Sequence, residues 1–412
     1  MNVRNSIAVG LALTLGAAIS VDAADFFVNE TIDNYDASPG DGVCFVPFTG
    51  NCSLRGAIQE ANAWPGQDTI WLGQGTFTLT RQGIGEDNAD TGDLDITEAV
   101  VIRGSGWDRT VISAGFIDRV FEINAPVGSL VSMQHLQIRY GNASIGGGGG
   151  IRNNSGDLSL FAVSVFGNLA TGGAGIMNSG TATLSDSEVA YNFTYATTSG
   201  GGITNGGSLT VRRSSIHNNG ADLQGGGIFN LGTLLSESST ISNNSPDGIY
   251  AFSSPVTSTV VVIGSTIADN FAWGLWIEGG GTGVPPTLTC TIVSGHLNAD
   301  CISGTSPPIS SGGFNLSGDG SCSDVQTDLV GDPLLGPLTG GATRTAARPP
   351  RLGSPAIDGG SNALCPVSDQ WAHARTMDGD HDGTATADIG ALEGVFLFAD
   401  GFESGDTSAW SP

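Results

Sequence analysis

A short glycine-rich motif returns at nearly constant spacing through the middle of the chain. The four clearest copies read "GGGI", "GAGI", "GGGI" and "GGGI", and they end, at intervals of 25, 27 and 25 residues, on Ile151, Ile176, Ile203 and Ile228. Degenerate copies follow at Ile249 and Leu275. A period of about 20 to 50 residues is typical of solenoids, in which each repeat packs against its neighbours to form one continuous core.

Each repeat also carries three short β-rich stretches and two asparagine positions. In one copy the stretches are Ile151–Asn153, Leu158–Leu160 and Val163–Val165. The period alone also fits leucine-rich repeats, but their dense leucine consensus is missing here. Three strands per repeat predict one coil of a parallel β-helix, with coils about 4.8 Å apart. Equivalent residues then lie above one another, in the columns Asn153, Asn178, Asn205, Asn230 and Asn168, Asn192, Asn219, Asn244, Asn270. We expect these asparagines to form ladders that stabilise turns, with a ligand-binding column as the alternative.

The segment "CFVPFTGNCSLRGAIQEANA" contrasts with the rest of the chain because it ends in a helical pattern. Leu54, Ala57, Ile58 and Ala61 fall on one apolar face of a short helix. The end of a β-helix exposes core and unpaired strand edges, which invite aggregation unless they are covered. We therefore expect this helix to cap the N-terminal end of the solenoid.

Composition and charge exclude some classes of partner. The chain has 64 glycines, only 13% charged residues and a formal net charge of -26, and its basic residues are all arginines. Such an acidic surface repels nucleic acid, anionic membranes and acidic polysaccharides, so we expect no nucleic-acid partner. Residues 1–23 have the pattern of a signal peptide, with Arg4, an apolar stretch and a small-residue cleavage site. No later stretch is long and apolar enough to predict a membrane-spanning segment.

Several motifs resemble known exported bacterial proteins. "CSLRGAIQEANA" resembles the N-terminal signature of right-handed parallel β-helix proteins named for Cys-Ser-Leu-Arg-Glu-Ala, with Gly56 in the place of the glutamate. "GEDNADTGDLDIT" and "VIRGSGWDRTVI" look like the segments that follow that signature, and the "GGGI" repeats are similar to those of polymorphic outer-membrane protein passengers. "VGDPLLGPLTGGATRTAARPPRLGSPAIDGG" and "DIGALE" resemble the choice-of-anchor Q module, although Trp371 and Ala372 replace its usual Arg-Gly.

The resemblance implies an all-β fold, export and location at the surface of a Gram-negative-type bacterium, or secretion. The expected organisation is a signal peptide (1–23), a cap with a disulfide and the short helix (24–68), a parallel β-helix (69–300), a C-terminal module (301–394) and a short tail (395–412). The tail, "FADGFESGDTSAWSP", has the look of the short tails of other exported proteins, and its role in anchoring stays open.

The six cysteines are expected to form disulfides, because an exported chain meets an oxidising compartment. A bridge between Cys44 and Cys52 would hold the start of the cap. Cys301 with Cys322 is the preferred second pair, which leaves Cys290 with Cys365. Six cysteines allow fifteen pairings, so other connectivities remain open.

β-Helices include polysaccharide lyases and glycoside hydrolases, so an enzyme is the alternative that must be weighed. Hydrolysis needs carboxylates that converge on one glycosidic oxygen. Acids are sparse in the regular repeats and do not recur in one column of adjacent coils, although Asp186 and Glu188 could lie on one strand face and are weak candidates. We expect a protein without evident catalysis, with a lyase or hydrolase as the alternative.

The segment "DGDHDGTATADI" contains the clearest metal-binding pattern. Asp378, Asp380 and Asp382 alternate before Gly383, and Asp388 follows. Alternating carboxylates before a turn glycine can bind calcium, although the match to an EF-hand loop is incomplete. The sequence therefore predicts a structural calcium ion here and no other cofactor, with a solvated acidic turn as the alternative.

The residue after each "GGGI" isoleucine should point outward if the isoleucine points into the core. Read coil by coil, this column contains Arg152, Met177, Thr204, Phe229, Tyr250 and Trp276. The last three form an aromatic run suited to stacking against sugar rings. We expect a structural, adhesive or glycan-binding surface protein with Phe229, Tyr250 and Trp276 as the binding residues and a carbohydrate or cell-surface partner. Burial of these rings under another part of the chain is the competing interpretation.

Overall fold

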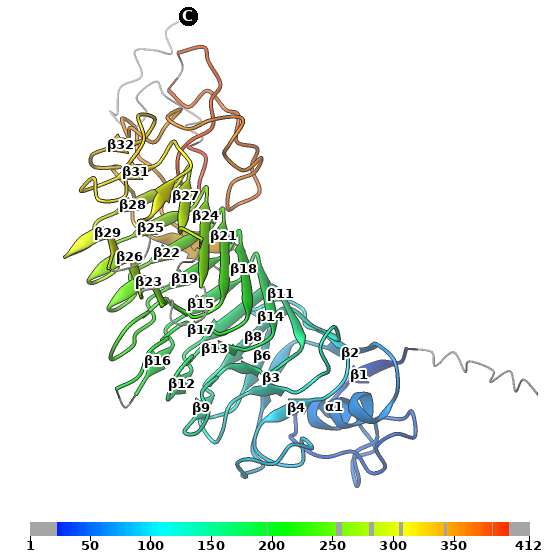
Figure 1. Ribbon diagram of the computed structural model, residues 1–412. Coiled ribbons are helices and arrows are strands. Elements are labelled where there is room, and N and C mark those ends of the chain that lie inside the picture. Colours follow the sequence, from blue (N-terminus) through cyan, green and yellow to red (C-terminus); the bar gives the residue numbers. More distant parts are fainter. Residues whose placement is uncertain are drawn as a thin grey trace, which may run out of the picture.

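A computed structural model describes residues 23–195, 197–252, 258–279, 284–304, 308–341, 344–380 and 382–394. All but the last residue of the expected signal peptide, and the whole tail from residue 395, lie outside the described residues. The described residues form an elongated stack of β-coils with one helix, α1 (Leu54–Ala63), at its N-terminal end (Figure 1). The architecture is therefore the all-β parallel β-helix that the repeats predict.

The stack has three faces, each a ladder of parallel strands. Two of these ladders belong to one 20-stranded sheet, because the long strands β8 and β11 contribute to both, and the third ladder is a separate 9-stranded sheet. The first face contains β1 (Asp25–Val28), β2 (Asp68–Leu72), β5 (Val100–Arg103), β8 (Leu130–Arg139), β11 (Asp157–Phe166), β14 (Thr181–Ser185), β18 (Ser208–Arg212), β21 (Thr233–Glu237), β24 (Thr259–Ile263), β27 (Thr287–Thr289) and β30 (Ser310–Ser311).

The second face again includes β8 and β11, which pass from the first face into it. Its other members are β3 (Gly75–Thr78), β6 (Thr110–Ser113), β15 (Glu188–Ala190), β19 (Ser215–His217), β22 (Thr240–Ser242), β25 (Thr266–Ala268), β28 (Ile292–Ser294), β31 (Leu316–Ser317) and β32 (Leu329–Val330). The third face contains β4 (Leu94–Ile96), β7 (Phe121–Ile123), β10 (Ile151–Asn153), β13 (Ile176–Asn178), β17 (Ile203–Asn205), β20 (Ile228–Asn230), β23 (Asp247–Phe252), β26 (Trp273–Glu278) and β29 (Ala299–Ser303).

Two smaller sheets complete the fold. A corner ladder contains β9 (Asn142–Ala143), β12 (Leu169–Ala170) and β16 (Phe193–Thr194), and an antiparallel pair contains β33 (Thr339–Gly341) and β34 (Arg344–Ala347). The corners between faces use left-handed backbone. His135 and Ala162, with φ of 55° and 51°, bend β8 and β11 where each strand passes from the first face to the second.

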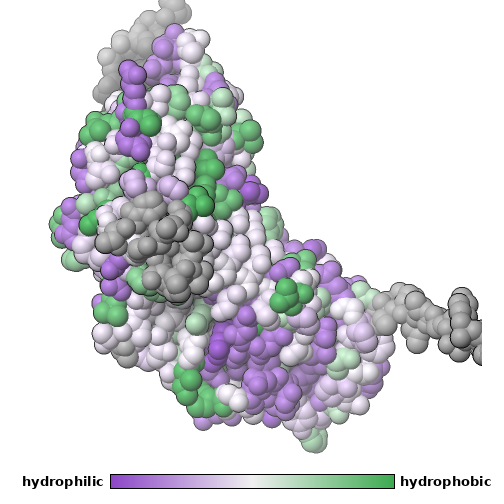
Figure 2. Space-filling model, viewed as in Figure 1, coloured by the Kyte–Doolittle hydropathy of each residue, from purple (hydrophilic) through white to green (hydrophobic). Residues whose placement is uncertain are grey.

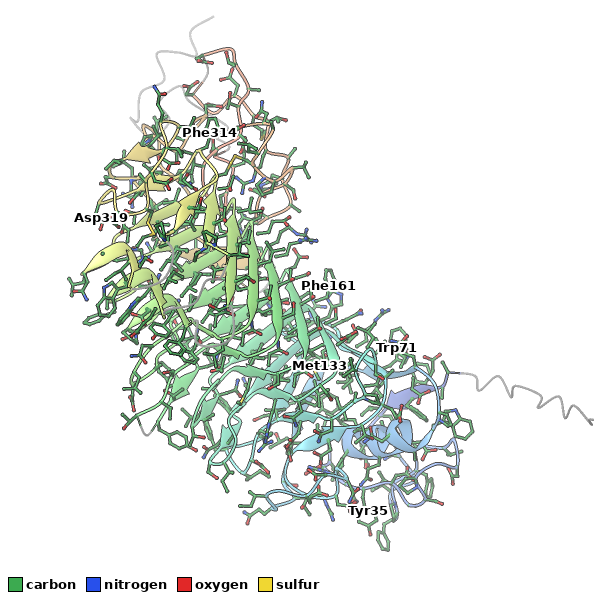
Figure 3. All side chains as sticks on the ribbon, viewed as in Figure 1. Tyr35, Trp71, Met133, Phe161, Phe314 and Asp319 are labelled. Carbon is green, nitrogen blue, oxygen red and sulfur yellow. A yellow bond between two sulfur atoms is a disulfide. The ribbon has the colours of Figure 1, made fainter. Side chains whose placement is uncertain are left out.

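The repeated residues stack in register, as the sequence predicts. Ile151 pairs with Ile176, Ile176 with Ile203, and Ile203 with Ile228, and all four side chains are fully buried. Figure 3 shows Met133 within the coils and Phe161 on their flank, and their exposures of 0% and 39% agree with these positions. The core is thus one continuous apolar column that runs along the stack.

Both asparagine columns form ladders of side-chain hydrogen bonds. In the first ladder the Nδ2 of Asn178 donates to Oδ1 of Asn205 at 2.8 Å. In the second, Nδ2 of Asn192 donates to Oδ1 of Asn219 at 2.9 Å, and Nδ2 of Asn219 donates to Oδ1 of Asn244 at 3.0 Å. Each amide therefore links one coil to the next, which supports the turn-stabilising interpretation.

Helix α1 covers the first coils, and it contacts β1, β2 and β4. Ser53 caps the helix, and its hydroxyl accepts a hydrogen bond from the backbone N–H of Gly56 at 3.0 Å. A side chain at Gly56 would place its Cβ 3.1 Å from the Ser53 hydroxyl and 3.4 Å from a backbone nitrogen, so this glycine fits tight packing behind the cap. No helix in the described part of the chain is long and apolar enough to cross a membrane.

The parallel ladder continues beyond residue 300, where the sequence placed the end of the β-helix. Strands β30, β31 and β32 pair with preceding coil strands, so coil structure extends to Val330. The chain then folds back along the flank of the coils (Figure 1). There Arg348 forms an ion pair with Asp269 at 2.7 Å, and the hydroxyl of Ser238 donates to the carbonyl of Ser368 at 2.8 Å.

Three disulfides fix the two ends of the molecule. Cys44 bonds to Cys52, Cys301 to Cys322, and Cys290 to Cys365, which are the pairs preferred from the sequence. The third bridge joins residues 75 positions apart and attaches the returning C-terminal segment to the coils.

Candidate functional site

The aromatic column lies on the third face, in the register that the sequence predicts. Phe229 on β20 pairs with Tyr250 on β23, and Tyr250 pairs with Trp276 on β26. A fourth ring, Trp273, lies at the start of β26. We call these four residues the aromatic strip.

The rings of the aromatic strip touch one after another. Phe229 and Tyr250 stack with their planes only 3° apart and their centroids 5.4 Å apart. Trp276 meets Tyr250 edge to face at 5.1 Å and packs against Trp273 at 4.4 Å. Cross-strand stacking of this kind follows from in-register parallel strands, because equivalent side chains lie one strand spacing apart.

Exposure differs along the strip. Tyr250 is only 4% exposed, whereas Phe229, Trp273 and Trp276 are partly exposed. Tyr250 is therefore the buried member of the three predicted binding residues, and it lies between rings that still reach solvent. Its hydroxyl donates to Oε2 of Glu278. Burial, and then the hydrogen bond to Glu278, raise the pKa of the Tyr250 phenol, so the ring stays neutral.

A buried acid lies beside the strip. Asp247, at the start of β23, is fully buried, and its Oδ2 accepts a hydrogen bond from the backbone N–H of Gly225 at 2.9 Å. Its Oδ1 has no hydrogen-bond partner among the described residues. Burial raises the pKa of this carboxyl to about 6, and the Gly225 hydrogen bond only partly offsets that effect. Sequence reasoning missed Asp247, Trp273 and Glu278, although two of them flank Trp276 on the same strand.

A cavity lies between the returning C-terminal segment and the flank of the coils. The cavity has a volume of about 300 Å³, and its polar and aromatic lining includes Trp107, His135, Asp186, Arg344, Gln370 and Trp371. The Arg344 guanidinium lies over the Trp371 ring, 3.7 Å from its centroid. These residues come from segments far apart in sequence, so no local sequence motif predicts the cavity.

The two weak catalytic candidates have separate partners. Asp186 lies in a corner with φ of 50°, and its carboxylate binds Arg213 through two contacts of 2.9 and 2.7 Å. Glu188 is on β15, and its Oε1 lies 3.6 Å from Nε2 of His217. The two acids thus occupy a corner and a strand instead of one strand face, and each carboxylate is directed toward its own basic partner.

The predicted calcium loop brings together a partly different set of acids. Asp378 and Asp380 offer oxygens within 4.8 Å of one from Asp358, which sequence reasoning missed because it lies twenty residues upstream. Asp382 accepts a hydrogen bond from the N–H of Thr384, and buried Asp388 accepts from Asp358 and Gly394. Burial raises the pKa of Asp388 to about 7. Calcium binding at this loop stays a prediction.

Comparison with known proteins supports the fold. A family described as "Right handed beta helix region" matches residues 129–322. No curated protein matches the chain. Among solved structures, the crystal structure of pectate lyase Pel9A matches with a TM-score of 0.50 and 13% sequence identity, over 91% of this chain and 97% of that one. At 13% sequence identity, this structural likeness shows only that the two chains share a fold.

Proposed function

Given a right-handed parallel β-helix with an aromatic strip along one face, we propose that this chain is a glycan-binding surface protein without catalytic activity. The observation that carries the proposal is the continuous contact of Phe229, Tyr250, Trp276 and Trp273 across three coils. Phe229 and Trp276, the partly exposed rings on either side of Tyr250, lie two coils apart, which at about 4.8 Å per coil is roughly 10 Å, so a segment of about two sugar rings can contact both.

Polar groups beside the rings suit the hydroxyls of a sugar. Glu278 is partly exposed and is held by the Tyr250 hydroxyl, which leaves its other carboxylate oxygen to accept from a ligand. The formal net charge of -26 disfavours polymers of acidic sugars. We therefore propose neutral or basic glycans as the ligand class, and export to the cell surface or medium as the setting in which they are met.

A polysaccharide lyase is the second candidate, and the structural likeness to a pectate lyase supports it. Lyase chemistry on uronates needs a base and cationic groups that neutralise the substrate acid. The basic residue of the outward column, Arg152, lies three coils away from Phe229 and is held 3.5 Å from Glu122. This placement favours the binding function over the lyase.

A glycan array on the mature chain, followed by calorimetry with the best ligand, tests the proposal. Phe229→Ala and Trp276→Ala should each weaken binding by roughly tenfold, which corresponds to about 1.4 kcal/mol for a lost stacking platform. Met177→Ala is the matched control, because Met177 is also half-buried and stands in the same outward column. Equal affinities for all variants would contradict the proposal, and release of unsaturated products from uronate polymers would favour the lyase.

A further inference from the structure

The N-terminal end of the outward column is acidic where the other end is aromatic. Asp95 on β4 pairs with Glu122 on β7, which pairs with Arg152 on β10. Asp87 comes from the loop just before β4. One carboxylate oxygen from each of Asp87, Asp95 and Glu122 lies within 4.8 Å of the other two. Figure 2 shows this part of the surface, over β4 beside the capped end, as a hydrophilic area.

The loop that carries Asp87 is held in a defined conformation. The backbone N–H of Ala89 donates to Oδ2 of Asp95 at 2.8 Å. The guanidinium of Arg55, from α1, donates to the carbonyls of Ala89, Gly92 and Asp93 at 2.8 to 3.0 Å. These contacts hold the loop against β4 and α1, so that Asp87 lies beside Asp95.

One member of this group has a buried oxygen without a hydrogen-bond partner in the described part of the chain. Asp95 is fully buried, and its Oδ1 has no hydrogen-bond partner among the described residues. Leaving a buried carboxylate oxygen without a donor is unfavourable, and a bound cation would satisfy it. The oxygens of Glu122, in contrast, already contact Arg119 and Asn154.

Neighbouring acids make the local charge strongly negative. Asp93 and Asp118 are also buried here, and Arg119 contacts Asp93 at 3.3 Å as well as Glu122. These carboxylates repel one another in their charged forms, which a bound cation would relieve.

We propose that Asp87, Asp95 and Glu122 form a calcium-binding site that ties the loop before β4 to the first coils. Calcium binds oxygen ligands at about 2.3 to 2.6 Å, so two oxygens on opposite sides of one ion lie up to about 5 Å apart. The separation of no more than 4.8 Å therefore suits a single ion. All three ligands are carboxylates, which favours calcium over metals that prefer nitrogen or sulfur. Asp87 is exposed, so water can complete the coordination.

The site does not depend on glycan binding, and it is separate from the C-terminal group of Asp358, Asp378 and Asp380. The experiment uses the full mature chain, freed of metal with a chelator and then titrated with Ca²⁺ by calorimetry and by terbium luminescence. We expect Ca²⁺ to bind and to raise the unfolding temperature, because it binds only the folded state. Asp87→Asn should weaken this binding roughly tenfold or more, since it removes one charged ligand of three.

Two further variants test whether the effect of Ca²⁺ comes from this site. Asp90→Asn is the matched control, because Asp90 lies on the same loop, is exposed and keeps its contact with Gln59 as an amide. Asp95→Asn should raise the unfolding temperature in chelator and abolish the increment that Ca²⁺ gives, a pair of effects that loss of a merely structural contact would not produce. The proposal is wrong if the chain binds no Ca²⁺, or if only Asp380→Asn reduces binding.

Discussion

At the scale of single residues, the glycine before each core isoleucine is required by space. Gly175 and Gly202 do not have positive φ, yet a Cβ on either would lie 2.5 Å from a carbonyl oxygen of the next coil. The left-handed positions include the first glycine of the motif, such as Gly200 with φ of 78°, and corner residues that bear side chains, such as Ala162 and Asp186. Close approach of the coils, and not turn formation, explains why the last glycine of each "GGGI" motif is kept.

Replacing one of these glycines should therefore destabilise the fold. In Gly202→Ala the new methyl group would meet the carbonyl of Gly227 at 2.5 Å and the Asn219 amide at 3.0 Å. We expect a loss of about 1 to 3 kcal/mol in the free energy of unfolding, measured by urea denaturation. Gly73→Ala is the control, because a Cβ there meets nothing within 4 Å. Equal midpoints for the two variants would show that the coils can separate without cost.

At the scale of elements, hydrogen-bonded columns join the coils at the corners. The two asparagine ladders could be predicted, because the same residue returns at the same place in every repeat. A third ladder was missed: the hydroxyls of Ser214 and Ser239 accept from the backbone N–H groups of Ser187 and Ser214, both at 3.1 Å. Serine is common in loops, so its recurrence does not stand out in the sequence. Once the coils stack, however, each serine lies above the next and bonds to it.

Removing one amide from the middle of a ladder should cost more than removing an exposed one. Asn219 accepts from the backbone and side chain of Asn192, and it donates to Val189 and Asn244. Asn219→Ala leaves several buried groups without partners, at about 1 to 3 kcal/mol for each group that water cannot reach.

The control for this prediction is Asn298→Ala, because the Asn298 side chain is exposed. Hydrogen exchange should show faster opening of β15, β19 and β22 in Asn219→Ala, since these strands lie next to the interrupted ladder. Protection unchanged from the parent chain would mean that the ladder contributes little to stability.

At the scale of the whole molecule, local repetition and long-range contacts differ in how far the sequence reveals them. The repeats specify the coil, the core column and the place of the aromatic strip, because equivalent residues recur at a fixed period. The return of the C-terminal segment depends on single contacts such as Arg375 with the carbonyl of Gly264, 111 residues away, and no periodic pattern reports them. The buried acids beside the strip and at the N-terminal end were missed for the same reason.

These buried acids should make the stability of the whole fold fall as pH rises. Asp247, Asp95, Asp388 and Asp93 have folded-state pKa values of about 6, 7, 7 and 8, whereas an aspartate in the unfolded chain titrates near pH 4. Between about pH 4 and 8 the folded chain therefore holds more protons than the unfolded chain. By linkage, the free energy of unfolding decreases across that window and levels off above it.

Urea denaturation in chelator should show this decrease in the free energy of unfolding between pH 4.5 and 8, with a size set by the pKa shifts of these four carboxyls. Asp247→Asn should flatten the lower part of the window, from about pH 4 to 6, because the neutral amide cannot lose a proton there. Stability that instead rises steadily to pH 8 would mean that these carboxyls are ionised and paired in the folded protein.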